Sequence, residues 1–161
     1  MFASDVDGVL TDAGMYYSES GDEWKKFNTR DGMGIKLLQR AGLITALVTM
    51  ERAKLVVRRA EKLAIPEVYL GVQDKLAVLR ELAAKHGLTL RQVAYIGDDV
   101  NDLEALEAVG FSAAPADGVP PILKAVDYVC RKKGGEGAVR EVADLILLAR
   151  SGNAHRSSGA R

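Results

Sequence analysis

Several residue types and patterns that mark particular protein classes are scarce in this 161-residue sequence. Cysteine occurs once, as Cys130, so the chain has no internal disulfide, which is typical of proteins from a reducing cytosol. Lys and Arg number 22 and so do Asp and Glu, so no net charge attracts nucleic acid or an anionic membrane. No apolar run approaches the length of a transmembrane helix, and no signal peptide precedes the first predicted strand. We therefore expect a cytoplasmic protein that binds neither nucleic acid nor membrane.

Short apolar runs alternate with amphipathic segments along the chain. The predicted strands are residues 2–4, 43–48, 68–70, 92–96 and, with a weaker signal, 110–114. The predicted helices are residues 32–40, 51–64, 75–85, 100–109 and 138–149. This alternation predicts an α/β fold built on a doubly wound parallel sheet, with its site at the carboxyl ends of the strands. The length fits one domain, at residues 1–150, followed by a disordered polar tail at 151–161.

One segment breaks the alternation. Residues 13–30, which we call the flap, hold two runs with aromatic residues on either side of a polar stretch that contains Gly21. This pattern predicts a small β-hairpin.

The densest chemical signal is Asp5-Val6-Asp7-Gly8, where the first predicted strand meets a loop. Residues two apart leave a strand on the same side, so the two carboxylates are expected to lie close together. Asp5 then suits a nucleophile and metal ligand, and Asp7 an acid/base beside it. Gly8 lets the backbone approach a bound anion. A simple Asp-rich turn is the alternative.

Two later strands also end in polar residues. Thr49 follows strand 43–48, where its hydroxyl and the next backbone N–H groups, beginning with Met50, suit a phosphate oxygen; Thr49 could equally cap the following helix. Asp98, Asp99 and Asp102 follow strand 92–96. Carboxylates so clustered repel one another unless a cation holds them, and hard oxygen donors favour Mg²⁺.

For the metal, we expect direct coordination by Asp98, by the Asp5 carboxylate and by the backbone carbonyl of Asp7. Asp99 and Asp102 are expected to hold these ligands in place rather than to touch the ion. Asp102 could instead supply charge at a helix N-terminus.

Taken in order, these motifs resemble those of the haloacid dehalogenase (HAD) superfamily, and the resemblance covers nearly the whole chain. It implies a phosphatase in which Asp5 attacks phosphorus and Asp7 protonates the leaving oxygen. It also implies that Lys75, at a helix start, neutralises the phosphate and the nucleophile. The flap stands where many members insert a cap domain and is far too short to be one, so we expect no cap.

Within the superfamily, the chain is most similar to capless phosphatases of phosphorylated 3-deoxy-2-ulosonic acids. Residues 31–36 and 134–141 also match that group. The resemblance implies a homotetramer in which the flap of one subunit, and sometimes its tail, covers the site of a neighbour.

The second motif bears on the substrate. Phosphatases for the eight-carbon acid usually read Thr-Gly-Arg here, whereas this chain reads Thr49-Met50-Glu51. The acid resembles the branch that acts on nine-carbon, sialic-acid-like 9-phosphates, so we expect that substrate class, with 3-deoxy-D-manno-octulosonate 8-phosphate as the alternative. Helical spacing places Glu51 on one face with Arg59 and Lys62, which suits Glu51 to sugar hydroxyls and either cation to the sugar carboxylate. A solvated, ion-paired helix face would explain the same residues.

The main non-enzymatic alternative is a receiver domain with a phosphorylated aspartate. In that class the acidic pair follows the first strand, the phosphoacceptor follows a middle strand, and the lysine comes late and precedes a proline. Here Lys75 precedes Leu76, and a further acidic cluster comes after it. The order of the motifs therefore favours the phosphatase.

Overall fold

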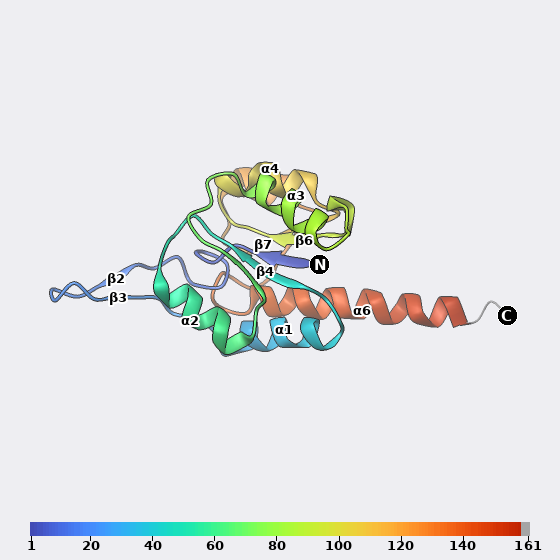
Figure 1. The fold of residues 1–161 in the computed structure, drawn as a ribbon, viewed down its shortest axis with the longest axis horizontal. Helices are drawn as coiled ribbons and strands as arrows, with labels where there is room; N and C mark the ends of the chain where they lie inside the picture. Colours follow the sequence, from blue (N-terminus) through green and yellow to red (C-terminus); the bar gives the residue numbers. More distant parts are fainter. Residues whose placement is uncertain (159–161) are drawn as a thin grey trace.

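The protein is a three-layer α/β structure with a parallel sheet in the middle layer (Figure 1). The structure, a computed structural model, describes residues 1–158, with the backbone alone for 152–158. The sheet has six strands, all parallel to their neighbours, which agrees with the parallel sheet predicted from the sequence.

The strand order β5-β4-β1-β6-β7-β8 places β1 in the interior of the sheet. The strands are β1 (Phe2–Ser4), β4 (Thr45–Val48), β5 (Glu67–Tyr69), β6 (Ala94–Ile96), β7 (Phe111–Ala114) and β8 (Tyr128–Val129). The chain runs outward from β1 through β4 to β5, then returns to β6 on the other side of β1. Parallel sheets bind ligands beyond the carboxyl ends of their strands at such a reversal, so β1 and β6 set the position of the site.

Helices cover both faces of the sheet. One face carries α1 (Thr29–Arg40), α2 (Lys54–Leu63) and α6 (Ala138–Ser158). The opposite face carries α3 (Lys75–Lys85), α4 (Leu103–Ala108) and α5 (Pro120–Ala125), and two 3₁₀ turns complete the helical segments, η1 (Leu90–Gln92) and η2 (Val100–Asp102).

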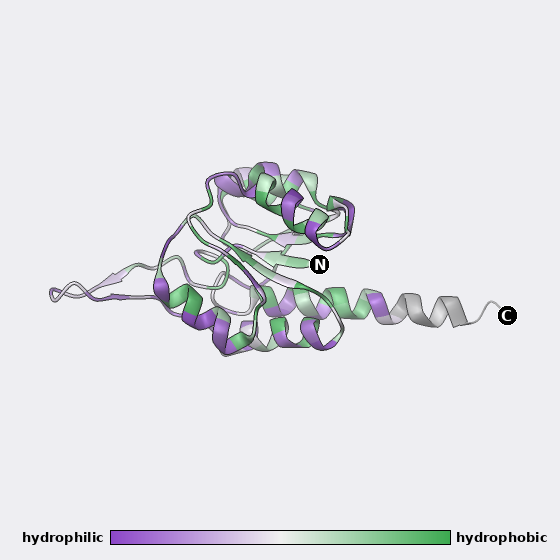
Figure 2. Ribbon diagram, in the orientation of Figure 1, coloured by the Kyte–Doolittle hydropathy of each residue, from purple (hydrophilic) through white to green (hydrophobic). Residues whose placement is uncertain are grey.

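The sheet divides the hydrophobic core into two clusters. Phe2 and Leu47 pack towards α1 and α6, whereas Ala3 and Val48 pack towards α3 and α4. Successive strand residues point to opposite faces, so both sides of each strand must be apolar. Figure 2 shows this, with hydrophobic strands in the middle and hydrophilic residues on the outer surfaces of the helices.

The flap forms the predicted hairpin and projects from the body of the molecule (Figure 1). Strands β2 (Tyr16–Tyr17) and β3 (Glu23–Trp24) pair antiparallel. An isolated bridge between Thr11 and Phe27 ties the base of the flap together. Within residues 1–158 the flap is the one hairpin beside the sheet and its helices, and no cap domain is present.

Helix α2 starts later than predicted, at Lys54, so Glu51 lies in a loop. Backbone contacts explain the delay, because the carbonyls of Thr49 and Glu51 accept hydrogen bonds from Val72 and Gly71 in the next loop rather than from their own helix. Val56, Ala60 and Leu63 form the buried, inward face of α2.

The C-terminal region differs most from expectation. Helix α6 continues to Ser158, whereas the sequence pattern predicts a disordered tail from Ser151; residues 159–161 lie outside the described residues. No proline interrupts 138–158, so the helical backbone hydrogen bonds can continue past the last apolar turn. Helix α5 and strand β8 are not predicted because both are short. None of the helices in the described part of the chain is long and apolar enough to span a membrane.

Candidate active site

Loops that follow β1, β4 and β6 meet at one edge of the sheet and form a pocket of about 280 Å³. Its lining includes most of the residues singled out in the sequence: Asp5, Asp7, Thr49, Met50, Glu51, Asp98 and Asp99. Ala13 and Met15 from the start of the flap complete one wall, and Asn101 another. The fold thus gathers side chains that are far apart in the sequence.

Asp5 stands directly after β1 and is 5% exposed. Its Oδ1 accepts a hydrogen bond from the Val6 amide at 2.7 Å, and its Oδ2 accepts one from Lys75 Nζ at 2.7 Å. Burial, with a further contribution from Asp102, raises the pKa of Asp5 to about 7, although Lys75 acts in the opposite direction. The carboxylate is thus held in a fixed orientation, and any added positive charge would stabilise its ionised form.

Lys75 is the first residue of α3, behind the helix cap Asp74, and it is 2% exposed. Its ammonium lies between two carboxylates, 2.7 Å from Asp5 and 2.6 Å from Asp102. Burial alone would lower the pKa of Lys75, but these two acids outweigh it and raise the pKa. Lys75 is therefore a fixed cation next to the Asp5 carboxylate.

Asp102 is completely buried, and both of its oxygens are engaged. Oδ1 accepts from Lys75 and from the Tyr95 hydroxyl, each at 2.6 Å. Oδ2 accepts from the amides of Asp98 at 3.1 Å and Asp99 at 3.3 Å. Asp102 therefore orients Lys75 and the loop that bears Asp98. Tyr95 is a part of this network that periodicity could not reveal, because a tyrosine in a buried strand resembles ordinary core.

Asp99 behaves differently from Asp102. It is exposed, and its Oδ1 accepts from the Val100 amide at 2.6 Å, so its side chain caps the turn η2. Its backbone amide, rather than its carboxylate, supports the cluster.

Asp98 completes an acidic cluster suited to a divalent cation. One carboxylate oxygen from each of Asp5, Asp98 and Asp102 lies within 4.8 Å of the others. Burial, followed by repulsion from Asp5 and Asp102, raises the pKa of Asp98 to about 8. A bound cation would remove this penalty, and hard carboxylate oxygens suit Mg²⁺. Each oxygen of Asp102 already accepts two hydrogen bonds, whereas each oxygen of Asp5 accepts one, so Asp5 and Asp98 are the side chains better placed to bind an ion.

Gly8 keeps this site open. Its φ is +77°, and a Cβ at this position would lie 1.9 Å from Oδ2 of Asp98. Any side chain at position 8 would displace the Asp98 carboxylate. The sequence predicts only that Gly8 lets the backbone approach an anion, whereas the structure requires a glycine here to leave room for Asp98.

Asp7 has one occupied and one free carboxylate oxygen. Oδ1 accepts from Lys25 Nζ at 2.6 Å and, at 3.5 Å, from the Thr11 hydroxyl. Oδ2 is buried and has no partner within the described residues. Neither Lys25 nor Thr11 is predicted as a site residue, because a lysine in a polar hairpin looks like any solvated surface charge.

The loop after β4 brings Thr49, Met50 and Glu51 to the pocket. Thr49 is 1% exposed, and its Oγ1 accepts from the Glu51 amide at 3.2 Å. The alternative of Thr49 as helix cap is wrong, because Ala53 occupies the N-cap position of α2. The Met50 sulfur accepts from the Asn101 side chain at 2.9 Å, which joins the two loops that flank the pocket.

Arg59 and Lys62 lie elsewhere. Both line a groove between α2 and the flap, together with Trp24. Arg59 donates to the Asn28 carbonyl at 2.9 Å, and its guanidinium lies 5.4 Å from the centre of the Phe27 ring. Within one chain, the structure does not bring these cations into the pocket that Glu51 lines, and Arg59 links α2 to the base of the flap.

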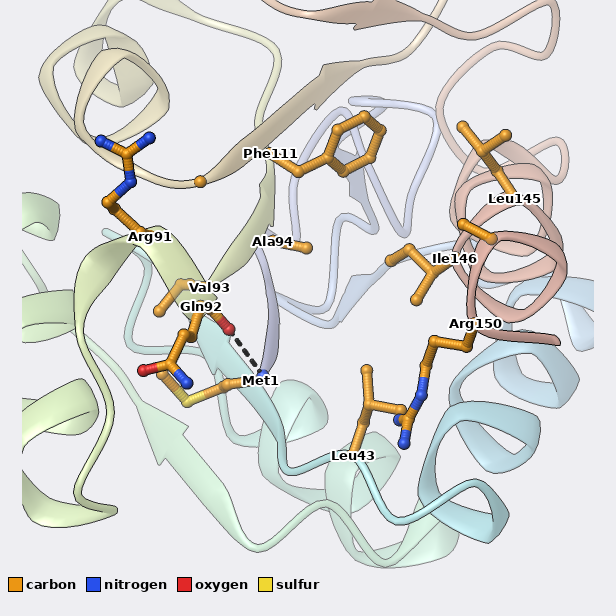
Figure 3. Close-up of a pocket in the computed structure, with 12 residues that line it drawn as sticks. Met1, Leu43, Arg91, Gln92, Val93, Ala94, Phe111, Leu145, Ile146 and Arg150 are labelled. Carbon is orange, nitrogen blue, oxygen red and sulfur yellow. Dashed lines mark hydrogen bonds between the residues drawn. The ribbon is translucent and has the colours of Figure 1, made fainter. Parts of the chain in front are cut away.

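Another hollow lies at the amino ends of the strands, against α6 (Figure 3). Apolar side chains such as Phe111 and Ile146 dominate its lining, with Arg91 and Arg150 at the rim. No carboxylate occurs among the described residues that line it. It therefore lacks the groups for hydrolytic chemistry, and the pocket around Asp5 is the candidate active site.

Comparisons with known proteins agree with this geometry. Residues 61–142 match the family model of haloacid dehalogenase-like hydrolases. The chain is 49% identical to the 3-deoxy-D-manno-octulosonate 8-phosphate phosphatase of Yersinia pestis over 145 residues, which cover 90% of this chain and 78% of that protein.

Solved structures are similar over most of their length. The Moraxella catarrhalis 3-deoxy-D-manno-octulosonate 8-phosphate phosphatase, in complex with magnesium, phosphate and the sugar acid, superposes with a TM-score of 0.91 at 40% identity and covers 98% of this chain and 91% of its own. The cobalt-bound Haemophilus influenzae enzyme gives a TM-score of 0.89 at 41% identity, covering 93% and 88%. This chain therefore belongs to the haloacid dehalogenase-like hydrolase family, within which it is a phosphatase.

Proposed function

We propose that the protein hydrolyses 3-deoxy-D-manno-octulosonate 8-phosphate with Mg²⁺, through a phosphoryl group carried transiently by Asp5. The observation that carries the reaction type is the buried Asp5 carboxylate between Lys75 and Asp98, at the carboxyl edge of the sheet. The relatives named above support this substrate, and they favour it over the nine-carbon acid preferred from the sequence.

In the first step, a carboxylate oxygen of Asp5 attacks phosphorus, and the bond from phosphorus to the sugar oxygen breaks. Asp7 gives its proton to that oxygen, so the sugar leaves as an alcohol. In the second step, water attacks phosphorus and Asp7 recovers a proton, which releases phosphate and restores Asp5.

The remaining residues hold the phosphoryl group. Lys75 supplies a fixed positive charge next to Asp5, and the Thr49 hydroxyl and the Met50 amide supply hydrogen bonds to phosphate oxygens. Mg²⁺, when bound by Asp5, Asp98 and the Asp7 carbonyl, would neutralise charge on the phosphoryl group.

We also propose that the active unit is a homotetramer in which a neighbour's flap covers each site. The flap exposes Tyr16, Tyr17 and Trp24, with exposed fractions of 46%, 70% and 61%. Exposed aromatic side chains gathered on one segment are typical of contact surfaces. A neighbour could also bring cations such as Lys62 towards a substrate carboxylate, which one chain alone does not do.

A nine-carbon 3-deoxy-ulosonic acid 9-phosphate is the second candidate substrate. The observation in its favour is Glu51, which lines the pocket where the eight-carbon enzymes usually have arginine.

Phosphate release from both sugar acid phosphates and from p-nitrophenyl phosphate, with and without a chelator, tests the proposal. We expect Mg²⁺-dependent turnover with the higher kcat/KM on the octulosonate 8-phosphate. A preference for the nine-carbon substrate would select the second candidate. Absence of p-nitrophenyl phosphate hydrolysis by the folded, Mg²⁺-loaded protein would overturn the phosphatase mechanism itself.

A further inference from the structure

Lys25 has a buried side chain on a segment that is otherwise exposed or half-buried. It directly follows β3, whose Trp24 is 61% exposed, yet the Lys25 side chain has an exposed fraction of 0%. Its ammonium lies 2.6 Å from Oδ1 of Asp7. Lysines are almost never fully buried unless they are paired, so this contact is a built-in feature of the flap rather than a chance surface ion pair.

Local geometry explains why Lys25, and not its neighbour, reaches Asp7. Side chains in an extended segment alternate between two sides, so consecutive lysines diverge. Lys26 turns outward, is 56% exposed and pairs with Asp12 at 3.0 Å. The bridge between Thr11 and Phe27 fixes the position of this extended segment beside the loop after β1.

The contact leaves Asp7 with two unlike oxygens. Oδ1 is held by Lys25 and Thr11, and Oδ2 is buried without a partner in the described structure. Lys25 and Thr11 therefore fix the orientation of the Asp7 carboxyl group at the edge of the pocket.

We propose that Lys25 is a positioning residue of the reaction, which holds the Asp7 carboxyl group through Oδ1 in the orientation that exchanges a proton with the leaving oxygen. This rests on the proposed function. As the Asp5 oxygen bonds to phosphorus and the ester bond breaks, the proton on Asp7 moves to the departing oxygen, and Lys25 keeps its own protons throughout. Because Lys25 belongs to the flap, this contact also links the flap to the acid.

Aryl phosphates whose phenols differ in acidity test this without relying on sugar recognition. A p-nitrophenolate leaves without needing a proton, whereas an unsubstituted phenolate benefits from one. We expect Lys25→Met to lower kcat about 100-fold on phenyl phosphate but only about 3-fold on p-nitrophenyl phosphate, since general acid catalysis contributes on the order of 10²-fold or more. Lys25→Arg should recover much of the loss on phenyl phosphate, because it keeps a positive charge beside Oδ1.

Two further variants decide between positioning and a structural role. Lys26→Met, the matched control in the same extended segment, should leave the ratio of the two substrates unchanged. In the Asp7→Asn background, Lys25→Met should add little further loss, because both changes remove the same proton transfer. Equal losses on both esters from Lys25→Met, or full additivity with Asp7→Asn, would overturn the proposal. Absence of hydrolysis by the parent protein would instead count against the proposed function.

Discussion

The carboxyl edge of the sheet and the flap contribute to the same pocket but differ in how they are held. At the sheet edge, Lys75 and Asp102 are buried, and every oxygen of Asp102 has a partner. The flap has two short strands, which carry the exposed aromatic side chains Tyr16, Tyr17 and Trp24. Under the proposed function, chemistry on the phosphoryl group would depend on groups that one folded chain holds in place, whereas contacts with the rest of the substrate would involve a segment with little support of its own.

The largest expected effect is at the sheet edge. Asp5→Asn removes the attacking carboxylate but keeps its size, so kcat should fall by about 10⁴-fold or more while the fold survives. Initial rates, together with far-ultraviolet circular dichroism, measure both quantities. A folded Asp5→Asn protein with more than a few per cent of the parent rate would exclude Asp5 as the nucleophile.

Lys75→Met should affect both activity and stability. Two buried carboxylates, Asp5 and Asp102, lose their shared cation, and breaking a buried ion pair in this way costs about 3–5 kcal/mol. Loss of the fixed charge next to the phosphoryl group should lower kcat by about 10²- to 10³-fold. Urea unfolding and initial rates measure the two effects. Lys85→Met, which changes the 57% exposed lysine at the other end of α3, is the control: kcat should be unchanged, and the loss of stability should be smaller because Glu67 keeps Tyr69 and His86 as partners. Unchanged stability of Lys75→Met would show that the cluster does not need this cation.

The acidic cluster predicts an unusual pH dependence for metal-free protein. Burial raises the pKa of Asp5 from 3.8 to about 7 and that of Asp98 from 3.8 to about 8. Between about pH 4 and about pH 8, these two carboxyl groups are ionised in the unfolded chain but still bind protons in the folded chain. The free energy of unfolding should therefore fall as pH rises through this range. Thermal unfolding in chelator at pH 5.5 and 8.0 should show the lower stability at pH 8.0.

Asp98→Asn sharpens that test. It removes one of the repelling carboxylates, so it should stabilise metal-free protein at pH 8.0 by on the order of 2 kcal/mol while abolishing turnover. Mg²⁺ should stabilise the parent at pH 8.0 but not Asp98→Asn. A variant less stable than the parent without metal would show that repulsion at Asp98 does not limit the stability of the metal-free protein.

The smallest stability effect is expected in the flap. Trp24→Ala should change the free energy of unfolding of a single chain by no more than about 0.5 kcal/mol, because the side chain is 61% exposed. If a neighbour's flap covers each site, the same change should weaken assembly and raise KM for the sugar acid phosphate more than for p-nitrophenyl phosphate. Light scattering and steady-state kinetics measure these effects. Unchanged assembly together with unchanged KM would remove the flap aromatics from the proposed interface.

Much of the sheet edge could be predicted from the sequence because its signals are local. Asp5 directly follows β1 and Asp98 comes two residues after β6, and strand ends in parallel sheets converge at one edge. The order of the motifs predicts Lys75 at a helix start, and α3 begins at that residue. Helical spacing failed at Glu51 because the loop after β4 bonds to the loop after β5, a long-range contact that leaves no local pattern.

By itself, the sequence determined the alternating α/β pattern, the flap hairpin and the acids at the strand ends, since each depends on residues close together in the chain. Only the tertiary structure decided which oxygen of Asp7 is free, that Lys25 is buried against it, and that Arg59 holds the base of the flap. The physical reason is that a lysine or arginine carries the same charge in solvent and in a site. Packing between distant segments, which periodicity does not record, decides where that charge is buried and what it binds.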